Sequence, residues 1–504
     1  MQCYINRREI HAERKRVKSL EYIMKGLEPA DAWRYFEEIS AIPRSSKNEK
    51  AVAEYVKKFA EERGLWVQMD EFYNLIIKKP GSKGCENLPA VLLQGHLDMV
   101  CEKEPGVEHD FSKEPIQLEI QQGNILRAKG TTLGADDGFA IAYMMAILDR
   151  QDLVHPPLEC VMTVQEEIGL VGALKLDGSA LTAKQMIGLD AGSEGKFLVT
   201  SSGGNFVDYE IPFTRIPFAG QAARIEIGGL LGGHSGGMAD AERGNANKLM
   251  GRILYRISQQ FSIHICQISG GTKVNAIPRE CQCVVALPQG SLEKAGAIVS
   301  AIEAELKAEY AFSDPGVFVS FAESTASSML DPVSSNQVIR ALHLMPTGRQ
   351  SMSKAIPGLI NASLNVSSVQ LAEDEGIIRI PVSIRSAENS LTKAITDELM
   401  DLAQILGFPA KEYGDYPAFS YSAQSPLRDK AMALYRQTSG KEPQILAVHG
   451  GTECGIFRSL CPGIDIIGFG PEKGDAHVPT EWMNIDSFRT TFQFLIRLLE
   501  ELTR

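Results

Sequence analysis

The pattern of apolar and polar positions predicts alternating helices and strands over the first part of the chain. A helix is expected near residues 30–39, and a second one ends at Gly64 and begins after Ser46 and Glu49, which have the spacing of a capping box. A strongly apolar helix is expected at 139–149. Three strand-like apolar runs are found at residues 91–100, 158–165 and 186–189. This alternation is typical of an α/β layer architecture with a central sheet.

From about residue 205 to residue 388 the pattern changes to strand–helix–strand units, which indicate an antiparallel α+β arrangement. The units comprise strands at 223–227, 262–268 and 282–287 and a helix at 245–261. The strand and helix pattern of residues 271–308 has a counterpart over residues 361–406, which predicts two related halves. The α/β texture returns after about residue 405. The second region is therefore expected to be an insertion.

The chain is too long for one ordinary core, because it has 504 residues and 44% apolar content. We expect an N-terminal extension at residues 1–23 and an α/β domain with a mixed central sheet, formed by residues 24–204 and 389–504. An inserted α+β domain of two related halves is expected at residues 205–388. The first boundary lies at Met24, after a charged segment, and the others follow the changes in the apolar pattern.

Charge and hydropathy exclude several classes of function. The formal net charge of -12 provides no basic surface to neutralise phosphates, so nucleic-acid binding is not expected. No run of about 18 apolar residues predicts a membrane span, and no apolar stretch followed by a small-residue cleavage site is found at the N-terminus. A cytoplasmic protein without a membrane partner is the expectation.

The first candidate chemical group lies at the end of an apolar strand. His96 and Asp98 are two residues apart, so in an extended chain they share a face. An imidazole can then bind a metal ion while the neighbouring carboxylate orients its ring. Taken alone, the pair is more typical of a hydrogen-bonded strand end than of a metal site.

Four further groups of ionisable residues follow predicted strands or precede a helix. Asp136 and Asp137 stand just before the apolar helix, where capping is an alternative explanation. Two adjacent carboxylates that end a buried strand need a nearby cation or a raised pKa, because they repel each other. The acidic pair and the two remaining candidates are Glu166 with Glu167, Asp190 at a strand end, and His477 in a late loop.

Together these groups place imidazoles and carboxylates at the strand ends of one α/β layer. Binding sites of open α/β sheets form at that edge. The mixture of ligands suits Zn²⁺, with Mn²⁺ or Co²⁺ as possible substitutes, and one shared carboxylate would allow two ions roughly 3.5–4 Å apart. This constellation indicates metal-assisted hydrolysis.

The order of the motifs resembles the cocatalytic zinc exopeptidases, a family that includes carboxypeptidase G-type enzymes, tripeptidase T and aminoacylases. The aminoacyl-histidine dipeptidases are most similar, from about Met24 to the end of the chain. The shared motifs are Gly-His-Leu-Asp at 95–98, Ala-Asp-Asp-Gly at 135–138, Glu-Glu-Ile-Gly at 166–169 and Asn-Ala-Ile-Pro-Arg-Glu at 275–280. Those closest to the dipeptidases lie at 232–237, 244–248 and 449–455.

The resemblance implies a catalytic domain that binds two Zn²⁺ ions. In this reading Asp136 bridges the ions, His96 and Asp190 complete one site, and Glu167 and His477 complete the other. The inserted domain is then expected to act as a lid. The family also has a cis peptide bond after the bridging aspartate, which predicts one between Asp136 and its successor.

The resemblance also implies catalytic and substrate-binding roles. Asp98 would orient the first histidine ligand, Glu166 would act as general base toward a zinc-activated water, and His234 on the lid would donate to the carbonyl oxygen. Arg385 is a candidate for holding the substrate carboxylate, with Asn275 beside it. A Gly-rich loop adds a further candidate for the substrate pocket, His449.

One departure from the dipeptidase pattern lies beside the expected bridging residue, since this chain has Asp137 where asparagine is typical. The expected activity is the hydrolysis of unblocked dipeptides, with Xaa-His or a broader specificity. A tripeptidase or an N-acyl amino acid hydrolase of the same clan is the alternative, followed by a non-catalytic peptide-binding relative. A monomer is as compatible with the sequence as a homodimer.

Overall fold

The computed structural model describes residues 22–504 and divides them into two compact units. Unit 1 holds the described residues up to Val199 together with Ser422–Leu446 and Ile456–Arg504, and unit 2 holds Thr200–Tyr421 and Ala447–Gly455. The expected N-terminal extension, apart from its last two residues, lies outside the described residues.

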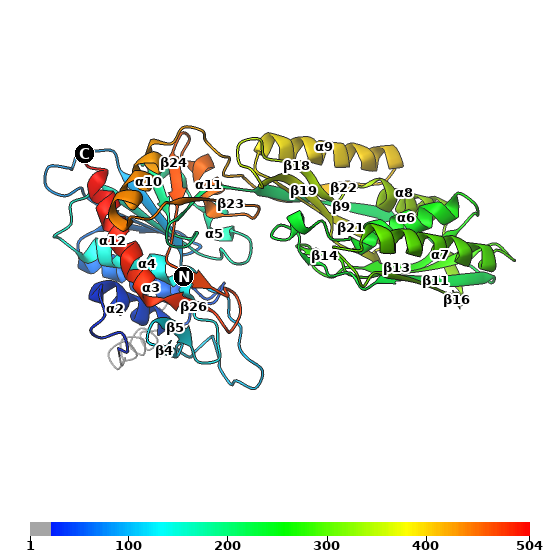
Figure 1. The fold of residues 1–504 in the computed structure, drawn as a ribbon, viewed down its shortest axis with the longest axis horizontal. Coiled ribbons are helices and arrows are strands. Elements are labelled where there is room, and N and C mark those ends of the chain that lie inside the picture. Colours follow the sequence, from blue (N-terminus) through cyan, green and yellow to red (C-terminus); the bar gives the residue numbers. More distant parts are fainter. Residues whose placement is uncertain (1–21) are drawn as a thin grey trace, which may run out of the picture. The chain divides into compact units, whose positions relative to one another are not determined.

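Unit 1 is built on an eight-stranded mixed sheet (Figure 1). Its strands, in spatial order, are β1 (Trp66–Met69), β2 (Leu75–Lys79), β6 (Leu158–Thr163), β3 (Val91–His96), β7 (Gln185–Gly188), β24 (Asp465–Gly468), β8 (Lys196–Ser201) and β23 (Gln444–Val448). The four strands β6, β3, β7 and β24 run parallel, whereas β1, β2 and β8 pair antiparallel with their neighbours. The mixed central sheet that the sequence predicts is confirmed.

Helices and a small second sheet complete unit 1. The helices are α2 (Ala30–Ser40), α3 (Lys50–Glu62), α4 (Ala135–Asp149), α5 (Val171–Lys175), α10 (Pro426–Ser439), α11 (Glu453–Leu460, which continues from unit 2) and α12 (Ile485–Glu501). The small sheet has the order β25 (Lys473–Gly474), β26 (Trp482–Asn484), β5 (Ile125–Ala128) and β4 (Leu118–Gln121). From Gly138 to Leu148, α4 is apolar and buried on all sides, so it forms the centre of the core.

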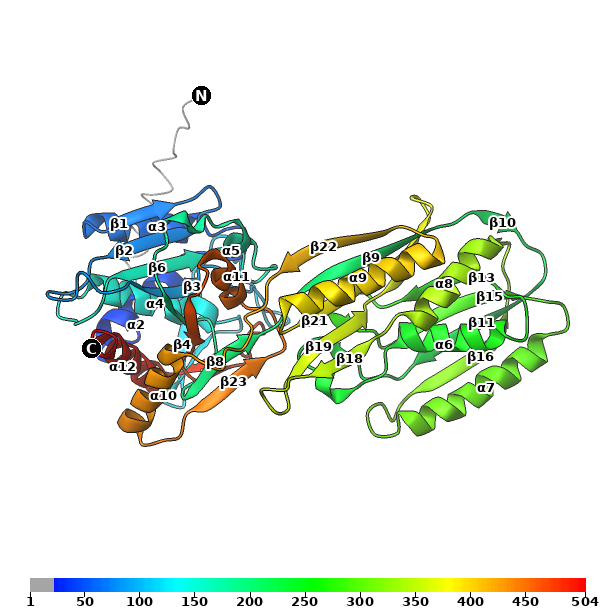
Figure 2. The same cartoon turned by 90° about the horizontal axis from the view of Figure 1, so that it is seen from above.

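Unit 2 contains a ten-stranded sheet whose recorded pairs are all antiparallel. Its strands are β16 (Phe318–Ser324), β11 (Gln221–Gly228), β15 (Cys281–Leu287), β13 (His264–Gly270), β20 (Val369–Ala372), β21 (Ile377–Ser386), β19 (Ile360–Val366), β18 (Gly348–Met352), β9 (Gly203–Pro212) and β22 (Ala410–Tyr416). The helices α6 (Ala246–Ser258), α7 (Leu292–Glu309), α8 (Pro332–Leu344) and α9 (Asn389–Leu406) lie along one face (Figure 2). Their apolar sides and the covered face of the sheet form a second core.

Two-stranded ladders add β10 (Arg215–Pro217) with β17 (Ser328–Leu330), and β12 (Gly233–His234) with β14 (Ala276–Ile277). The antiparallel α+β character predicted for the insertion is confirmed. The compact unit extends beyond the expected end at residue 388, because α9 packs on β9 and β21, and β22 pairs with β9.

The predicted capping box before α3 is wrong. The helix begins at Lys50, and Glu49 at its N-cap makes no side-chain capping bond. Ser46 Oγ donates instead to Asp98 Oδ2 at 2.7 Å, and Glu49 Oε1 accepts from the backbone N–H of Gln165 at 3.0 Å. Both side chains therefore stabilise distant segments of unit 1.

Candidate metal centre and polar groups of unit 2

Three parallel strands deliver the predicted metal ligands to one edge of the unit 1 sheet. β3 ends at His96, β6 is followed by Glu166 and Glu167, and β7 is followed by Asp190. Since β6 and β7 pair with β3 in parallel, their carboxyl ends lie on the same side. Asp136 reaches this edge from the first turn of α4, where the peptide bond to the next residue is cis, as predicted.

The first group of ligands surrounds the ring of His96, which is 1% exposed. Its Nε2 lies 3.8 Å from Asp136 Oδ1 and 3.9 Å from Asp190 Oδ1. On the other side of the ring, Nδ1 lies 3.1 Å from the carbonyl oxygen of Asp98 and 3.5 Å from its Oδ1. Burial lowers the pKa of His96, but contacts with Asp136 and Asp98 outweigh it and raise the pKa well above its usual value.

The second group lies on the other carboxylate oxygen of Asp136. His477 Nε2 is 3.6 Å from Asp136 Oδ2 and 3.0 Å from Glu167 Oε1. Contacts with Asp136 and then Glu167 raise the pKa of His477 to about 10. Asp136 thus faces both histidines, one with each oxygen, which is the arrangement expected of a bridging carboxylate.

The donor atoms fit divalent cations. Sets of ligand atoms within 4.8 Å of one another are formed by His96, Asp137 and Asp190, by His96, Glu166 and Glu167, and by Asp136, Glu167 and His477. Glu167 Oε1 and Asp137 Oδ1 are buried and accept no hydrogen bond of regular geometry from the described residues. Burial raises the pKa of Asp190 to about 7, helped by Asp136 and opposed by His96. Buried carboxylates that lack hydrogen-bond donors, or whose pKa is raised, are stabilised by bound cations.

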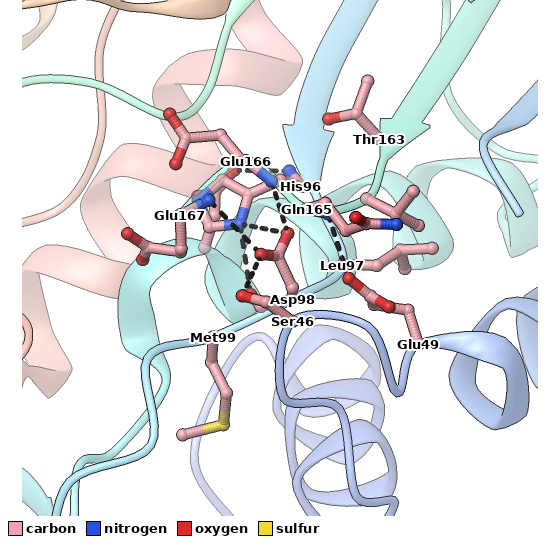
Figure 3. A network of polar contacts seen from close by, with 12 residues as sticks. Ser46, Glu49, His96, Leu97, Asp98, Met99, Thr163, Gln165, Glu166 and Glu167 are labelled. Atoms are coloured by element: carbon pink, nitrogen blue, oxygen red, sulfur yellow. Dashed lines mark hydrogen bonds and ion pairs between the residues drawn. The ribbon is translucent and has the colours of Figure 1, made fainter. Parts of the chain in front are cut away.

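Asp98 also organises the turn that carries the two glutamates (Figure 3). Its Oδ1 accepts from the N–H of Glu166 at 3.0 Å, and its Oδ2 accepts from the N–H of Glu167 at 3.3 Å. Burial raises the pKa of Asp98, but His96 and the other donors outweigh it, so the pKa is lowered and the carboxylate stays ionised. One carboxylate therefore contacts both the ring of His96, a candidate ligand, and the backbone of Glu166, the candidate general base.

In unit 2, backbone donors select one tautomer of His234. The N–H groups of Gly236 and Gly237 donate to His234 Nδ1 at 3.2 and 2.9 Å. Nδ1 is therefore the acceptor, and in the neutral ring the proton is on Nε2. Burial and the charge of Arg385 lower the pKa of His234 and keep the ring neutral. The exposed ring can donate one hydrogen bond through Nε2.

The loop of His234 lies close to Arg385 and His449. A Cβ on Gly236 would lie 2.5 Å from the carbonyl oxygen of His449 and 3.2 Å from Arg385 Nε, so only glycine fits there without a shift. Arg385 Nη1 donates to the hydroxyl of Tyr416 at 3.0 Å. The Nε of Arg385 is buried without a hydrogen-bond partner in residues 22–504. A buried, unsatisfied guanidinium N–H suits an anionic ligand.

Both ring nitrogens of His449 are occupied by serine hydroxyls. Nδ1 lies 2.8 Å from Ser202 Oγ and Nε2 lies 2.7 Å from Ser363 Oγ. Burial and the charge of Arg385 lower the pKa of His449 to about 4, so the ring is neutral near pH 7. Asn275 has an exposed side chain. Its backbone carbonyl oxygen accepts from the N–H of Ser235 at 2.8 Å.

Comparisons with known proteins agree with this geometry. The profile of peptidase family M20/M25/M40 matches residues 92–501. The chain belongs to this family. All five predicted metal ligands lie within the matched residues 92–501.

Relatives of this M20/M25/M40 peptidase match it over nearly its whole length. It is similar to the cytosol non-specific dipeptidase of Escherichia coli (strain K12), with 34% identity over 480 residues, 94% of this chain and 98% of that protein. A crystal structure of aminoacylhistidine dipeptidase from Vibrio alginolyticus has a TM-score of 0.86 and 33% identity and covers 96% of this chain and 98% of its own. A tripeptidase from Staphylococcus aureus shares the fold, with a TM-score of 0.54, 17% identity and coverage of 95% and 99%.

A bilayer-spanning helix would need more length and apolar character than any helix between residues 22 and 504 has.

Sequence reasoning missed a pair of buried residues that hold the ligand-bearing loops of the M20/M25/M40 peptidase. Arg44 donates to the carbonyl oxygens of Leu97 and Asp98 at 3.0 and 3.1 Å, and also to that of Gly134. Glu481 accepts through Oε2 from the N–H groups of Leu133 and Gly134 at 2.7 and 2.9 Å. Its Oε1 accepts from the N–H of Asp136 at 3.2 Å. The signal in the sequence for Glu481 is its position four residues after the candidate ligand His477.

Proposed function

We propose that this chain is a metal-dependent dipeptidase that hydrolyses unblocked dipeptides, with Xaa-His or a broader specificity. The observation that carries the proposal is the position of Asp136, which faces His96 with one oxygen and His477 with the other. Such a shared carboxylate is typical of a dinuclear hydrolase. The nearly full-length similarity to dipeptidases supports a dipeptide as substrate.

The proposed cofactor is a pair of Zn²⁺ ions, for which Mn²⁺ or Co²⁺ can substitute. His96, Asp136 and Asp190 would hold one ion, and Asp136, Glu167 and His477 the other. Mixed imidazole and carboxylate ligands are those that zinc prefers in catalytic sites. When bound, the ions would polarise the scissile carbonyl group and lower the pKa of the attacking water.

The chain's own residues would then transfer protons and stabilise the negative charge that develops on the substrate. Glu166 would accept a proton from the attacking water and pass it to the departing amine. Asp98 would keep this glutamate in place through its backbone N–H, at 3.0 Å. His234 would donate from Nε2 to the carbonyl oxygen as negative charge develops there. The bonds from Gly236 and Gly237 support this donor role, because they fix the required tautomer.

Recognition of the substrate is proposed for unit 2. The unsatisfied Nε of Arg385 suits the terminal carboxylate of a dipeptide. His449 and Asn275 would complete the substrate-binding set. We further propose that the inserted domain acts as a lid made of two related halves. The active form is proposed to be a monomer or a homodimer. A cytosolic location is proposed from the name of the Escherichia coli relative.

A tripeptidase or an N-acyl amino acid hydrolase remains the second candidate, because relatives with this fold include a tripeptidase. Metal-loaded protein should be tested against dipeptides, tripeptides and acetylated amino acids, with detection of the amino acids released. Release from dipeptides with a free amino group, and little from the other two classes, is expected. Preference for tripeptides or acetylated substrates would replace the proposed function with the second candidate, and no hydrolysis of any substrate would favour a non-catalytic peptide-binding protein.

A further inference from the structure

A lysine ammonium group lies inside the cluster of candidate metal ligands. Lys473 Nζ donates to Asp136 Oδ1 at 2.7 Å, and the two side chains are only 13% and 17% exposed. Nζ also lies 5.3 Å from the centre of the buried Phe139 ring. The ammonium group and the carboxylate of Asp136 form a largely buried ion pair.

Regular structure holds the main chain at this lysine. Lys473 begins β25 and is opposite Met483 of β26. The preceding residue, Glu472, donates its N–H to Ser487 Oγ at 2.8 Å, and its carbonyl oxygen accepts from the N–H of Asn484 at 2.9 Å. These contacts anchor the backbone on both sides, so the ammonium group is placed in the cluster by a paired strand.

Asp137 places a second buried carboxylate among the candidate ligands. The side chain is fully buried, its Oδ2 accepts from the N–H of His96 at 3.2 Å, and its Oδ1 has no hydrogen-bond partner among residues 22–504. A Cβ on Gly95 would lie 2.6 Å from Oδ2, so glycine makes room for this carboxylate. The ligand atom of Asp137 lies within 4.8 Å of those of His96 and Asp190. An ionised carboxylate here needs cations around it.

We propose that Lys473 is a positioning residue that holds Asp136 and offsets the charge of Asp137, so that the lysine and the second aspartate together set the affinity of the centre for divalent cations. The inference rests on the metal centre of the proposed function.

The two side chains should act on a bound divalent cation with opposite signs. The ammonium group repels the cation and competes for Asp136 Oδ1, so its removal should strengthen binding. The carboxylate of Asp137 attracts the cation, so its replacement by an amide should weaken binding. A unit charge a few ångströms away in a partly screened site changes the dissociation constant by about tenfold or more.

The test is a Zn²⁺ titration of the metal-free, full-length protein near neutral pH, in competition with a chromophoric chelator. Lys473→Met should bind Zn²⁺ about tenfold more tightly than the unaltered protein, and Asp137→Asn about tenfold more weakly. The double variant should return to within about threefold of the unaltered protein, since the two changes offset each other. Lys83→Met, which removes the charge of an exposed lysine in unit 1, should leave the affinity unchanged.

Lys473→Gln provides a polar, uncharged replacement if the methionine variant does not fold, and thermal unfolding of each variant checks the fold. Weaker binding in both Lys473 variants, or losses that add in the double variant, would overturn the inference, because a merely structural role gives that result. Unchanged affinity in all variants overturns it as well. If the unaltered protein binds no divalent cation, the proposed function itself fails.

Discussion

The polar clusters of the two units differ in charge and in how their groups are satisfied. In unit 1, buried carboxylates face two histidines, and the pKa values of His96 and His477 are raised by these acids. In unit 2, Arg385 and the hydroxyl groups around His449 form a cluster in which the pKa values of both histidines, His234 and His449, are lowered. The first cluster is suited to cations and the second to an anion.

This contrast separates the two parts of the proposed reaction. Variants of unit 1 should change metal binding or proton transfer, whereas variants of unit 2 should change turnover or substrate affinity and leave the metal content intact. Loss of metal ions in a unit 2 variant would contradict this division of roles. So would normal turnover in a general-base variant.

The largest effect is expected for Glu166→Gln. Removal of the general base should lower turnover by about 10²–10⁴-fold. The metal content should stay, because the backbone N–H that Asp98 holds is retained. Steady-state kinetics and elemental analysis on the same preparation check this, with Glu62→Gln on the exposed side of α3 as a matched control. Near-normal turnover would mean that another residue accepts the proton.

His234→Ala should lower turnover by about 10²–10³-fold, the usual effect of removing one donor to a developing oxyanion. The metal content should not change, since the residue belongs to the cluster of unit 2. His234→Gln, which keeps a donor, should recover part of the loss. Kinetics with a good dipeptide substrate are the measurement, and a loss of bound metal would contradict the assignment.

Glu481→Gln should weaken metal binding by about 10–100-fold, the range found when partners behind metal ligands are altered. An amide has one acceptor oxygen and cannot replace both carboxylate oxygens, which accept from Leu133, Gly134 and Asp136. Chelator competition measures the change, and Glu472→Gln at an exposed position is the control. Unchanged affinity would show that the loop keeps its geometry without this carboxylate.

The smallest effect concerns stability and pH in unit 2. Burial and Arg385 lower the pKa of His449 to about 4, so between pH values of roughly 4 and 6.5 the unfolded chain binds more protons than the folded one. The neutral ring therefore causes stability to fall as the pH drops through that window, by about 1–2 kcal/mol between pH 7 and pH 5. Urea unfolding of His449→Gln should show a loss smaller by this amount, and an identical loss would contradict the lowered pKa.

Sequence patterns predicted most of the fold because local periodicity determines the elements. The apolar runs at 91–100, 158–165 and 186–189 became β3, β6 and β7, and the apolar helix became α4. Their parallel pairing explains why residues that follow separate strands lie together. The end of the insertion was harder to predict, because the strand that extends unit 2, Ala410–Tyr416, is largely polar and pairs with the distant β9.

The supporting residues of the metal centre were not predictable from local patterns. Arg44 bonds to a carbonyl group 90 positions away, and Glu481 accepts from an N–H 348 positions away. Ser46 and Glu49 have a helix-capping spacing, yet their partners lie 52 and 116 positions away. Tertiary contacts override a local preference in these cases, so only the structure reveals the roles of these side chains.

The most direct test of the account is the metal stoichiometry of Asp136→Ala. The unaltered protein, purified without chelators, should contain up to two zinc-type ions per chain. Because each oxygen of Asp136 faces a different histidine, the variant should lose occupancy at both positions. Elemental analysis and Zn²⁺ titration of the two proteins, with circular dichroism to verify the fold, give the answer. Loss of only one ion would contradict the bridging role of Asp136.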